Sequence, residues 1–223
     1  MQELVIERYH QLRDGASVLA FDPYGDKVLK LKDGTMLKLF RLKRFYSSAR
    51  WLPYSKRFER NVQLLHDRAI PTVSVLHCYN IPEIGRTAIH YAPLEGLTLR
   101  EIHDQNADGL GHQLIEKTAQ FIQGLHAKGI YFRSLHLGNI IVGSDQHLGL
   151  IDVADMRFYR KALRPALIRR NFQHLFRYVK DVKRLGAIDH DLFIKSYLHY
   201  ADLSQGEKAS LFQKLKSALP NAA

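Results

Sequence analysis

The first forty residues alternate short apolar runs with turn residues. Three of these runs, 17–21, 27–32 and 35–41, have the length and composition of antiparallel strands. Asp33–Gly34 separates the last two runs, and this dipeptide suits the positive φ angles of a tight type I′ hairpin turn. In the third run, apolar residues occupy both faces around Lys38. The pattern therefore predicts a small sheet in which the Lys38 ammonium group needs an anionic partner.

An amphipathic helix is predicted after this hairpin. Its apolar stripe recurs at helical spacing and consists of Tyr54, Phe58, Val62 and Leu65. Glu59 flanks the stripe on one side and Asn61 flanks it on the other. Residues 70–72 and 87–91 are then interpreted as the remaining strands of a five-stranded sheet.

The rest of the chain is predicted to be mainly helical. Pro93 and Gly96 mark residues 92–99 as a linker. Helices are predicted over residues 114–125, 169–184 and 191–200, and after the capping box Ser204–Glu207. We therefore predict an α+β fold class, with a small antiparallel sheet plus one helix over residues 1–91 and a helical lobe over residues 92–223.

Composition and charge narrow the function classes. The chain has 223 residues, 46% of them hydrophobic, which is enough for a packed core. Its single cysteine, Cys78, excludes a cysteine metal cluster and fits a reducing compartment. No window approaches the roughly 20 apolar residues of a membrane span, so we expect a cytoplasmic protein. A net charge of +11, dense over residues 41–60 and 157–184, favours an anionic surface or substrate.

The loop that follows the helix 114–125 carries the candidate chemistry. The sequence Tyr131-Phe-Arg-Ser-Leu-His-Leu-Gly-Asn139 is followed by a short apolar run, and Leu-Ile-Asp152 comes ten residues later. An Asn on a loop and an Asp at a strand end can hold Mg²⁺ against nucleotide phosphates.

This spacing resembles the catalytic core of the protein-kinase-like superfamily, in which a loop of type H-G-D-L-H-x-x-N precedes a metal-binding Asp. Over residues 17 to about 185 the chain is similar to the bacterial lipopolysaccharide core kinase family, toluene-tolerance-type members included, which phosphorylates Kdo or heptose. Lys38 in Lys-Leu-Phe-Arg, Asp152 with its following Asp155-Met-Arg, and the basic segment 169–178 also carry the resemblance.

The resemblance implies a bilobal protein-kinase-like fold with ATP and Mg²⁺ as cofactors. It assigns Asn139 and Asp152 to catalysis and to the metal. It assigns Lys38 to the α- and β-phosphates and Tyr91, just before the linker, to the nucleotide site. Glu59 is the candidate for the carboxylate that pairs with this lysine, and an exposed helix carboxylate is the alternative role for it. The partner it implies is the lipopolysaccharide core or another anionic glycolipid, with peripheral contact at the inner membrane.

Two positions depart from the family pattern. Ser134 stands where the catalytic Asp is expected, and a hydroxyl is no comparable proton acceptor at neutral pH. Asp155 and His136 are the candidates for a substitute base, although for His136 a hydrogen bond to the loop backbone is the commoner role. Residues 22–26 contain one glycine where kinases have a glycine-rich loop, which leaves the backbone less freedom to approach phosphates.

Two functions therefore stay open. One is ATP-dependent phosphorylation of an inner-core sugar, weakened by Ser134. The other is a pseudokinase or scaffold that binds nucleotide, glycolipid or a partner enzyme in core assembly. Nucleic-acid binding ranks third, because the chain lacks a zinc motif, an aromatic-stacking strand signature and a helix-turn-helix.

Overall fold

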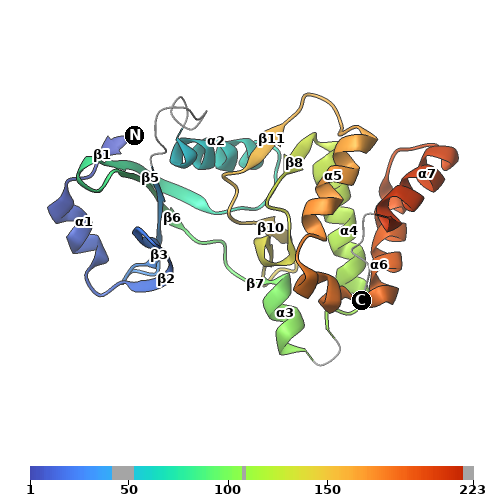
Figure 1. Cartoon of the computed structure of the whole chain (residues 1–223), viewed down its shortest axis with the longest axis horizontal. Coiled ribbons are helices and arrows are strands. Elements are labelled where there is room, and N and C mark those ends of the chain that lie inside the picture. The colour runs from blue at the N-terminus through green and yellow to red at the C-terminus, as the bar shows by residue number, and fades with distance from the viewer. Residues whose placement is uncertain (42–52, 107–108, 218–223) are drawn as a thin grey trace. The chain divides into compact units, whose positions relative to one another are not determined.

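The computed structural model describes residues 1–41, 53–106 and 109–217, and it divides the chain into two compact units (Figure 1). The first unit contains Met1–Leu94 together with Asp152–Ala154. The second contains Glu95–Ile151 and the residues from Asp155 onward. The division predicted after residue 91 lies after Leu94, and the segment Asp152–Ala154, predicted to belong to the helical lobe, is part of the first unit.

The first unit is built on a six-stranded sheet with the strand order β1-β5-β6-β4-β3-β2. Its strands are β1 (Gln2–Glu3), β2 (Ser17–Asp22), β3 (Gly25–Lys30), β4 (Met36–Arg41), β5 (Ser74–Ile81) and β6 (Arg86–Ala92). Neighbouring strands are antiparallel except β1 and β5, which are parallel. Helices α1 (Ile6–Arg13) and α2 (Tyr54–His66) complete the unit.

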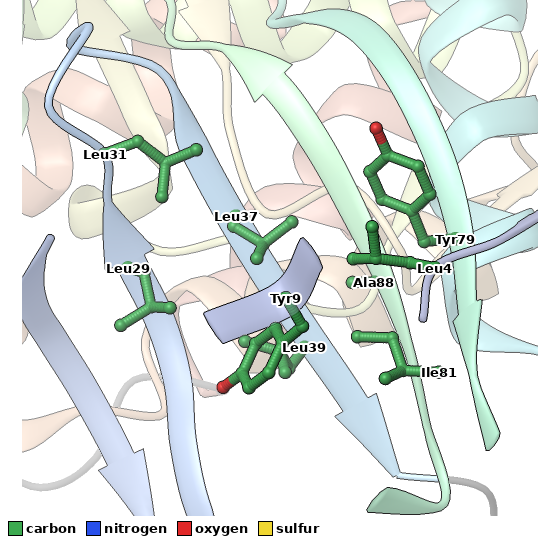
Figure 2. Close-up of a cluster of buried hydrophobic side chains, with 9 residues drawn as sticks. All are labelled: Leu4, Tyr9, Leu29, Leu31, Leu37, Leu39, Tyr79, Ile81 and Ala88. Carbon is green, nitrogen blue, oxygen red and sulfur yellow. The ribbon is translucent and has the colours of Figure 1, made fainter. Parts of the chain in front are cut away.

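One face of this sheet packs against the N-terminal residues and α1. Figure 2 shows the cluster that fills it, in which Tyr9 of α1 lies over Leu39 and Leu4 lies beside Ala88. Its members are Leu4, Tyr9, Leu29, Leu31, Leu37, Leu39, Tyr79, Ile81 and Ala88. Because side chains alternate across a strand, Lys38 points to the opposite face from Leu37 and Leu39. On that face Phe58 of α2 packs against the rings of Phe40 and Tyr91.

Two local predictions for this unit are wrong. The β3–β4 turn is not a type I′ turn, because only Gly34 has a positive φ, and Asp33 Oδ1 instead accepts a hydrogen bond from the Thr35 backbone N–H. The strand predicted at 70–72 begins at Ser74, since Pro71 has no N–H to give to a ladder. The sheet also gains β1, a two-residue strand whose exposed polar sequence carries no strand signal.

The second unit is mainly helical. Its helices are α3 (Leu99–Gln105), α4 (His112–Ala127), α5 (Pro165–Leu175), α6 (Val179–Tyr200) and α7 (Gln205–Lys216). Two small sheets accompany them, one of β7 (Leu97–Thr98), β9 (Ile140–Val142) and β10 (Leu148–Leu150), the other of β8 (Ile130–Phe132) and β11 (Met156–Phe158). A single turn of 3₁₀ helix, η2 (Leu137–Asn139), lies between β8 and β9, and a second, η1 (Pro82–Ile84), joins β5 to β6 in the first unit.

Helix ends in this unit follow partly from the sequence. Gly129 after α4 has φ +71°, and a Cβ there would lie 2.3 Å from the Tyr159 carbonyl oxygen, so only glycine fits. The predicted capping box is confirmed, because Ser204 and Glu207 exchange side-chain and backbone hydrogen bonds. The predicted break between the helices 169–184 and 191–200 lies elsewhere, because α5 ends at Leu175 and α6 begins at Val179. Near this break the rings of Phe172, Phe176 and Phe193 pack together.

The predicted fold class is thus confirmed: a small, mostly antiparallel sheet with helices is followed by a helical unit. None of the helices in the described residues is both long enough and apolar enough to cross a membrane.

Candidate functional site

The site in the first unit is centred on an ion pair between Lys38 and Asp152. Lys38 lies mid-strand in β4, flanked by Val28 of β3 and Ile89 of β6. Its side chain is 9% exposed, and its Nζ lies 2.5 Å from Oδ1 of Asp152, whose side chain is 46% exposed. The anionic partner that the strand pattern required is therefore Asp152, 114 residues away in sequence.

Helix α2 holds the segment that carries Asp152. Asn61 is 5% exposed, and its Nδ2 donates to the carbonyl oxygens of Val153 at 2.7 Å and Ala154 at 3.3 Å. Asp152 itself has φ +56°, a conformation that costs energy for a residue with a Cβ and that surrounding contacts must maintain. Asn61 is thus a positioning residue. Its spacing of three from Phe58 puts it on the buried face of α2, a signal that the sequence contained.

Glu59 does not pair with Lys38, which corrects the role predicted for it. Its carboxylate lies 2.7 Å from Nζ of Lys56, three residues earlier on α2, and its side chain is 38% exposed. Neighbouring Phe58 faces the core at 1% exposure, so Glu59 is turned toward solvent by helical geometry. Asp152 takes the place that the prediction gave to Glu59.

Tyr91, at the end of β6, lines the same face of the sheet as Lys38. Its ring packs against Phe58 with centroids 5.6 Å apart. Burial, and secondarily the negative charge of Asp152, raises the pKa of Tyr91 to about 12. At neutral pH the hydroxyl therefore keeps its proton and remains a hydrogen-bond donor.

The connection between β2 and β3 is occupied by its own contacts. Asp22 Oδ1 accepts from the Tyr24 backbone N–H at 2.8 Å and pairs with Arg86 at 3.0 Å. The Tyr24 N–H first, and then Arg86, hold the pKa of Asp22 below its usual range, against the effect of burial. A backbone N–H that a glycine-rich loop would offer to phosphate is thus bound to a carboxylate here.

The second unit contains the loop that carries Ser134 and Asn139. Asn139 is 6% exposed, and its Nδ2 donates to the Ser134 carbonyl oxygen at 2.8 Å. His136 Nδ1 accepts from the Gly138 N–H at 3.1 Å, the backbone role considered for it. The Arg133 N–H donates to the Asp155 carbonyl oxygen at 3.0 Å, while the Asp155 carboxylate lies 3.5 Å from an Arg133 guanidinium nitrogen. These bonds fix the loop around a half-buried Ser134.

The residues assigned to Mg²⁺ supply oxygen ligands, which this ion prefers. Asp152 offers a half-exposed carboxylate that Lys38 already contacts. Asn139 uses its Nδ2 in the bond to Ser134, which leaves Oδ1 as its ligand atom. The described residues contain no group of three or more His, Cys, Asp or Glu side chains that could hold a metal by themselves. By residue type, each of the two side chains suits a cation whose other ligands are phosphate oxygens and water.

Because Lys38 is more deeply buried than Asp152, removing either charge of the pair should change the free energy of unfolding by a different amount. Asp152→Asn leaves a buried ammonium group without its counter-ion, and we expect a loss of about 1–2 kcal/mol of unfolding free energy, less than for a fully buried pair. Lys38→Met leaves a carboxylate that water can solvate, and we expect a change near zero. Urea unfolding measures both.

The exposed pair Lys32–Asp14, with side chains 65% and 79% exposed, is the matched control. Lys32→Met and Asp14→Asn should both have small effects. Equal losses for the two Lys38–Asp152 variants would contradict the asymmetry.

Comparisons with known proteins add structural likenesses only. No family model matches the chain, and no curated protein matches it in sequence. Among solved structures, WbdD, crystallised with the kinase inhibitor LY294002, is 14% identical with a TM-score of 0.48. The match covers 89% of this chain, which spans 43% of that chain. A divergent kinase from Toxoplasma that lacks the glycine-rich loop is 13% identical with a TM-score of 0.49, over 99% of this chain and 83% of that one.

Proposed function

We propose that this chain is a lipopolysaccharide-kinase-like protein that binds ATP with Mg²⁺ and phosphorylates an inner-core sugar weakly. The observation that carries the proposal is the ion pair between Lys38 and Asp152. A lysine buried in a sheet and paired with a half-exposed carboxylate is an arrangement that phosphates and a divalent cation can enter, with Lys38 moving from Asp152 to a phosphate oxygen. The acceptor sugar and the inner-membrane location follow from the resemblance in sequence.

The proposed roles follow from charge. Lys38 would neutralise phosphate oxygens, and Asp152 and Asn139 are the residues whose side-chain oxygens would hold Mg²⁺. When bound, Mg²⁺ supplies charge neutralisation on the phosphates. Tyr91 keeps its proton and can donate to a nucleotide. Ser134 would orient the acceptor hydroxyl by hydrogen bonding, and the proton of that hydroxyl would pass to water, a weaker base than a carboxylate, so transfer is expected to be slow.

A pseudokinase is the second candidate, and specific observations favour it. Ser134 has no charge, Glu59 is paired away from Lys38, and the Tyr24 N–H is taken by Asp22. Each of these removes a part that active kinases use, either to hold the phosphates or to accept the proton of the acceptor hydroxyl. In this form the chain binds nucleotide, glycolipid or a partner enzyme in core assembly without transferring phosphate.

Calorimetric titration with ATP, with and without Mg²⁺, tests the shared step. We expect binding that requires Mg²⁺ and that Asp152→Asn weakens by about tenfold or more, because a ligating charge is removed. Asp202→Asn is the control, since Asp202 is exposed in the second unit and the charge change is the same. Absence of any nucleotide binding would contradict both nucleotide-dependent forms. Transfer of labelled phosphate to a core oligosaccharide then separates enzyme from pseudokinase.

A further inference from the structure

A group of cationic side chains surrounds one tyrosine–histidine contact in the second unit. Tyr131 of β8 and His174 of α5 share a hydrogen bond, with 2.9 Å between the hydroxyl oxygen and Nε2. Their rings stand edge to face with centroids 5.9 Å apart. Tyr131 is 4% exposed, so it is the buried member of this contact. We call the basic site the set Tyr131, Arg133, Arg157, Arg170, His174 and Arg177.

The backbone brings the four arginines to this contact. Arg133 directly follows the last residue of β8, and its positive charge acts on both Tyr131 and His174. Arg157 of β11 is the direct cross-strand partner of Tyr131. Arg170 precedes His174 by one helical turn on α5, and Arg177 follows in the turn whose N–H donates to the His174 carbonyl oxygen at 3.2 Å. Two strands and one helix thus supply positive charge around a single point.

The charge of the basic site is poorly balanced. The Asp155 carboxylate lies 3.5 Å from a guanidinium nitrogen of Arg133 and balances part of this charge. Arg157, Arg170 and Arg177 pair with no carboxylate whose side chain the structure describes. Burial, and then Arg133, Arg170 and Arg177, lower the pKa of His174, which favours the neutral imidazole that can accept a hydrogen bond from the Tyr131 hydroxyl. Several guanidinium groups held together repel one another unless an anion joins them.

We propose that the basic site binds a phosphate- or carboxylate-bearing group of the acceptor, beside the Ser134 loop. The location rests on covalent continuity, because Arg133 is the residue before Ser134 and its N–H is bonded to Asp155. The substrate class rests on the proposed phosphotransfer, while anion binding itself can be measured without it. Phosphorylated sugars and acidic sugars such as those of a lipopolysaccharide core share this chemistry.

A single oxyanion suits the basic site better than a nucleic acid. Guanidinium groups present paired N–H donors that match phosphate and carboxylate oxygens. Tyr131 is buried, and its hydroxyl is engaged with His174, so its ring offers no platform on which a base could stack. The arginines also converge on one contact, whereas nucleic-acid binding needs a stripe that follows a phosphate backbone.

Calorimetry with glucose 6-phosphate tests the basic site, with glucose as the uncharged match. We expect weak binding of the phosphate sugar only, lowered about tenfold by Arg170→Gln or Arg177→Gln, because each removes a charge-assisted hydrogen bond. Arg169→Gln is the matched control, as it is exposed on the same helix and loses the same charge. It should change the affinity less than about twofold.

Further measurements define the outcomes that would overturn the proposal. If Arg169→Gln and Arg170→Gln lower the affinity for glucose 6-phosphate equally, the sugar is attracted by positive charge in general and not by the basic site. If only Lys38→Met lowers this affinity, the phosphate binds at the nucleotide site. Phosphatidylglycerol vesicles distinguish a lipid headgroup as the source of the phosphate, since co-sedimentation would then depend on Arg170 and Arg177. The proposal would also be contradicted if a short RNA binds in a manner that requires Arg170 and Arg177 while glucose 6-phosphate does not bind. The ATP affinity of the same variants should be unchanged. A failure of the proposed function can therefore be told apart from a failure of the basic site.

Discussion

Ser134→Asp should raise phosphate transfer to a core oligosaccharide by on the order of 10²–10⁴, the usual contribution of a general base. The substitution places a carboxylate where the kinase loop has one. The backbone can accept it, because Asn139 bonds to the carbonyl of residue 134 and not to its side chain. Arg133 next to it and partial exposure allow the new charge to be solvated. Transfer of labelled phosphate measures the effect.

Two controls make this result specific. Ser144→Asp introduces the same charge at an exposed turn between β9 and β10 and should not change transfer. ATP affinity should stay nearly the same in Ser134→Asp, since the proton acceptor does not bind the nucleotide. Robust turnover by the unmodified protein, unaffected by Asp155→Asn or His136→Ala, would contradict our account of the missing base.

The sequence could predict the residues whose burial conflicts with their charge. Lys38 was recognisable because apolar neighbours in β4 leave an ammonium group without water, and the structure provides Asp152 as its partner. Asn61 could have been recognised from its place on the buried face of α2, but a neutral amide gives no sign of the two backbone carbonyls it binds. Their identity depends on a segment more than 90 residues later in the chain.

Local patterns failed where contacts distant in sequence decide the structure. Glu59 has the right residue type for a partner of Lys38, yet Lys56 is one helical turn away and the helix turns both toward solvent. The end of α5 lies where three phenylalanine rings pack, and no glycine or proline marks it. The positive charge over residues 157–184 favoured an anionic partner, and only the pairing of β8 with β11 shows that Arg157 lies opposite Tyr131.

A buried network in the second unit supports the Ser134 loop and should make stability depend on pH. His126 is 2% exposed at the end of α4. Its Nε2 lies 3.0 Å from Asn171 Oδ1, and its Nδ1 lies 2.9 Å from the Tyr197 hydroxyl oxygen. The Asn171 Nδ2 donates to the Phe132 carbonyl oxygen at 2.6 Å, two residues before Ser134. Nε2 therefore carries the imidazole proton, because Oδ1 of Asn171 can only accept.

Burial lowers the pKa of His126 from 6.5 to about 4, because both hydrogen-bond partners are neutral and the charged form is poorly solvated. The unfolded chain takes up a proton near pH 6.5, whereas the folded protein takes it up near pH 4. Stability from this group is therefore fully present above about pH 6.5 and is lost as the pH falls toward 4. The difference corresponds to a loss on the order of 3 kcal/mol.

His126→Gln should flatten this dependence, since glutamine can neither gain a proton nor leave the core charged. Urea unfolding between pH 7 and pH 4.5 measures it, and the informative quantity is the slope of unfolding free energy against pH. The substitution lowers stability at pH 7 as well, but that loss does not alter the slope.

His90 and His174, whose pKa values burial also lowers, contribute in both proteins and cancel in the comparison. His112→Gln, at the exposed start of the same helix, should keep the original slope. If His126→Gln also keeps the original slope, protonation of the buried imidazole is not what makes the stability of this network depend on pH.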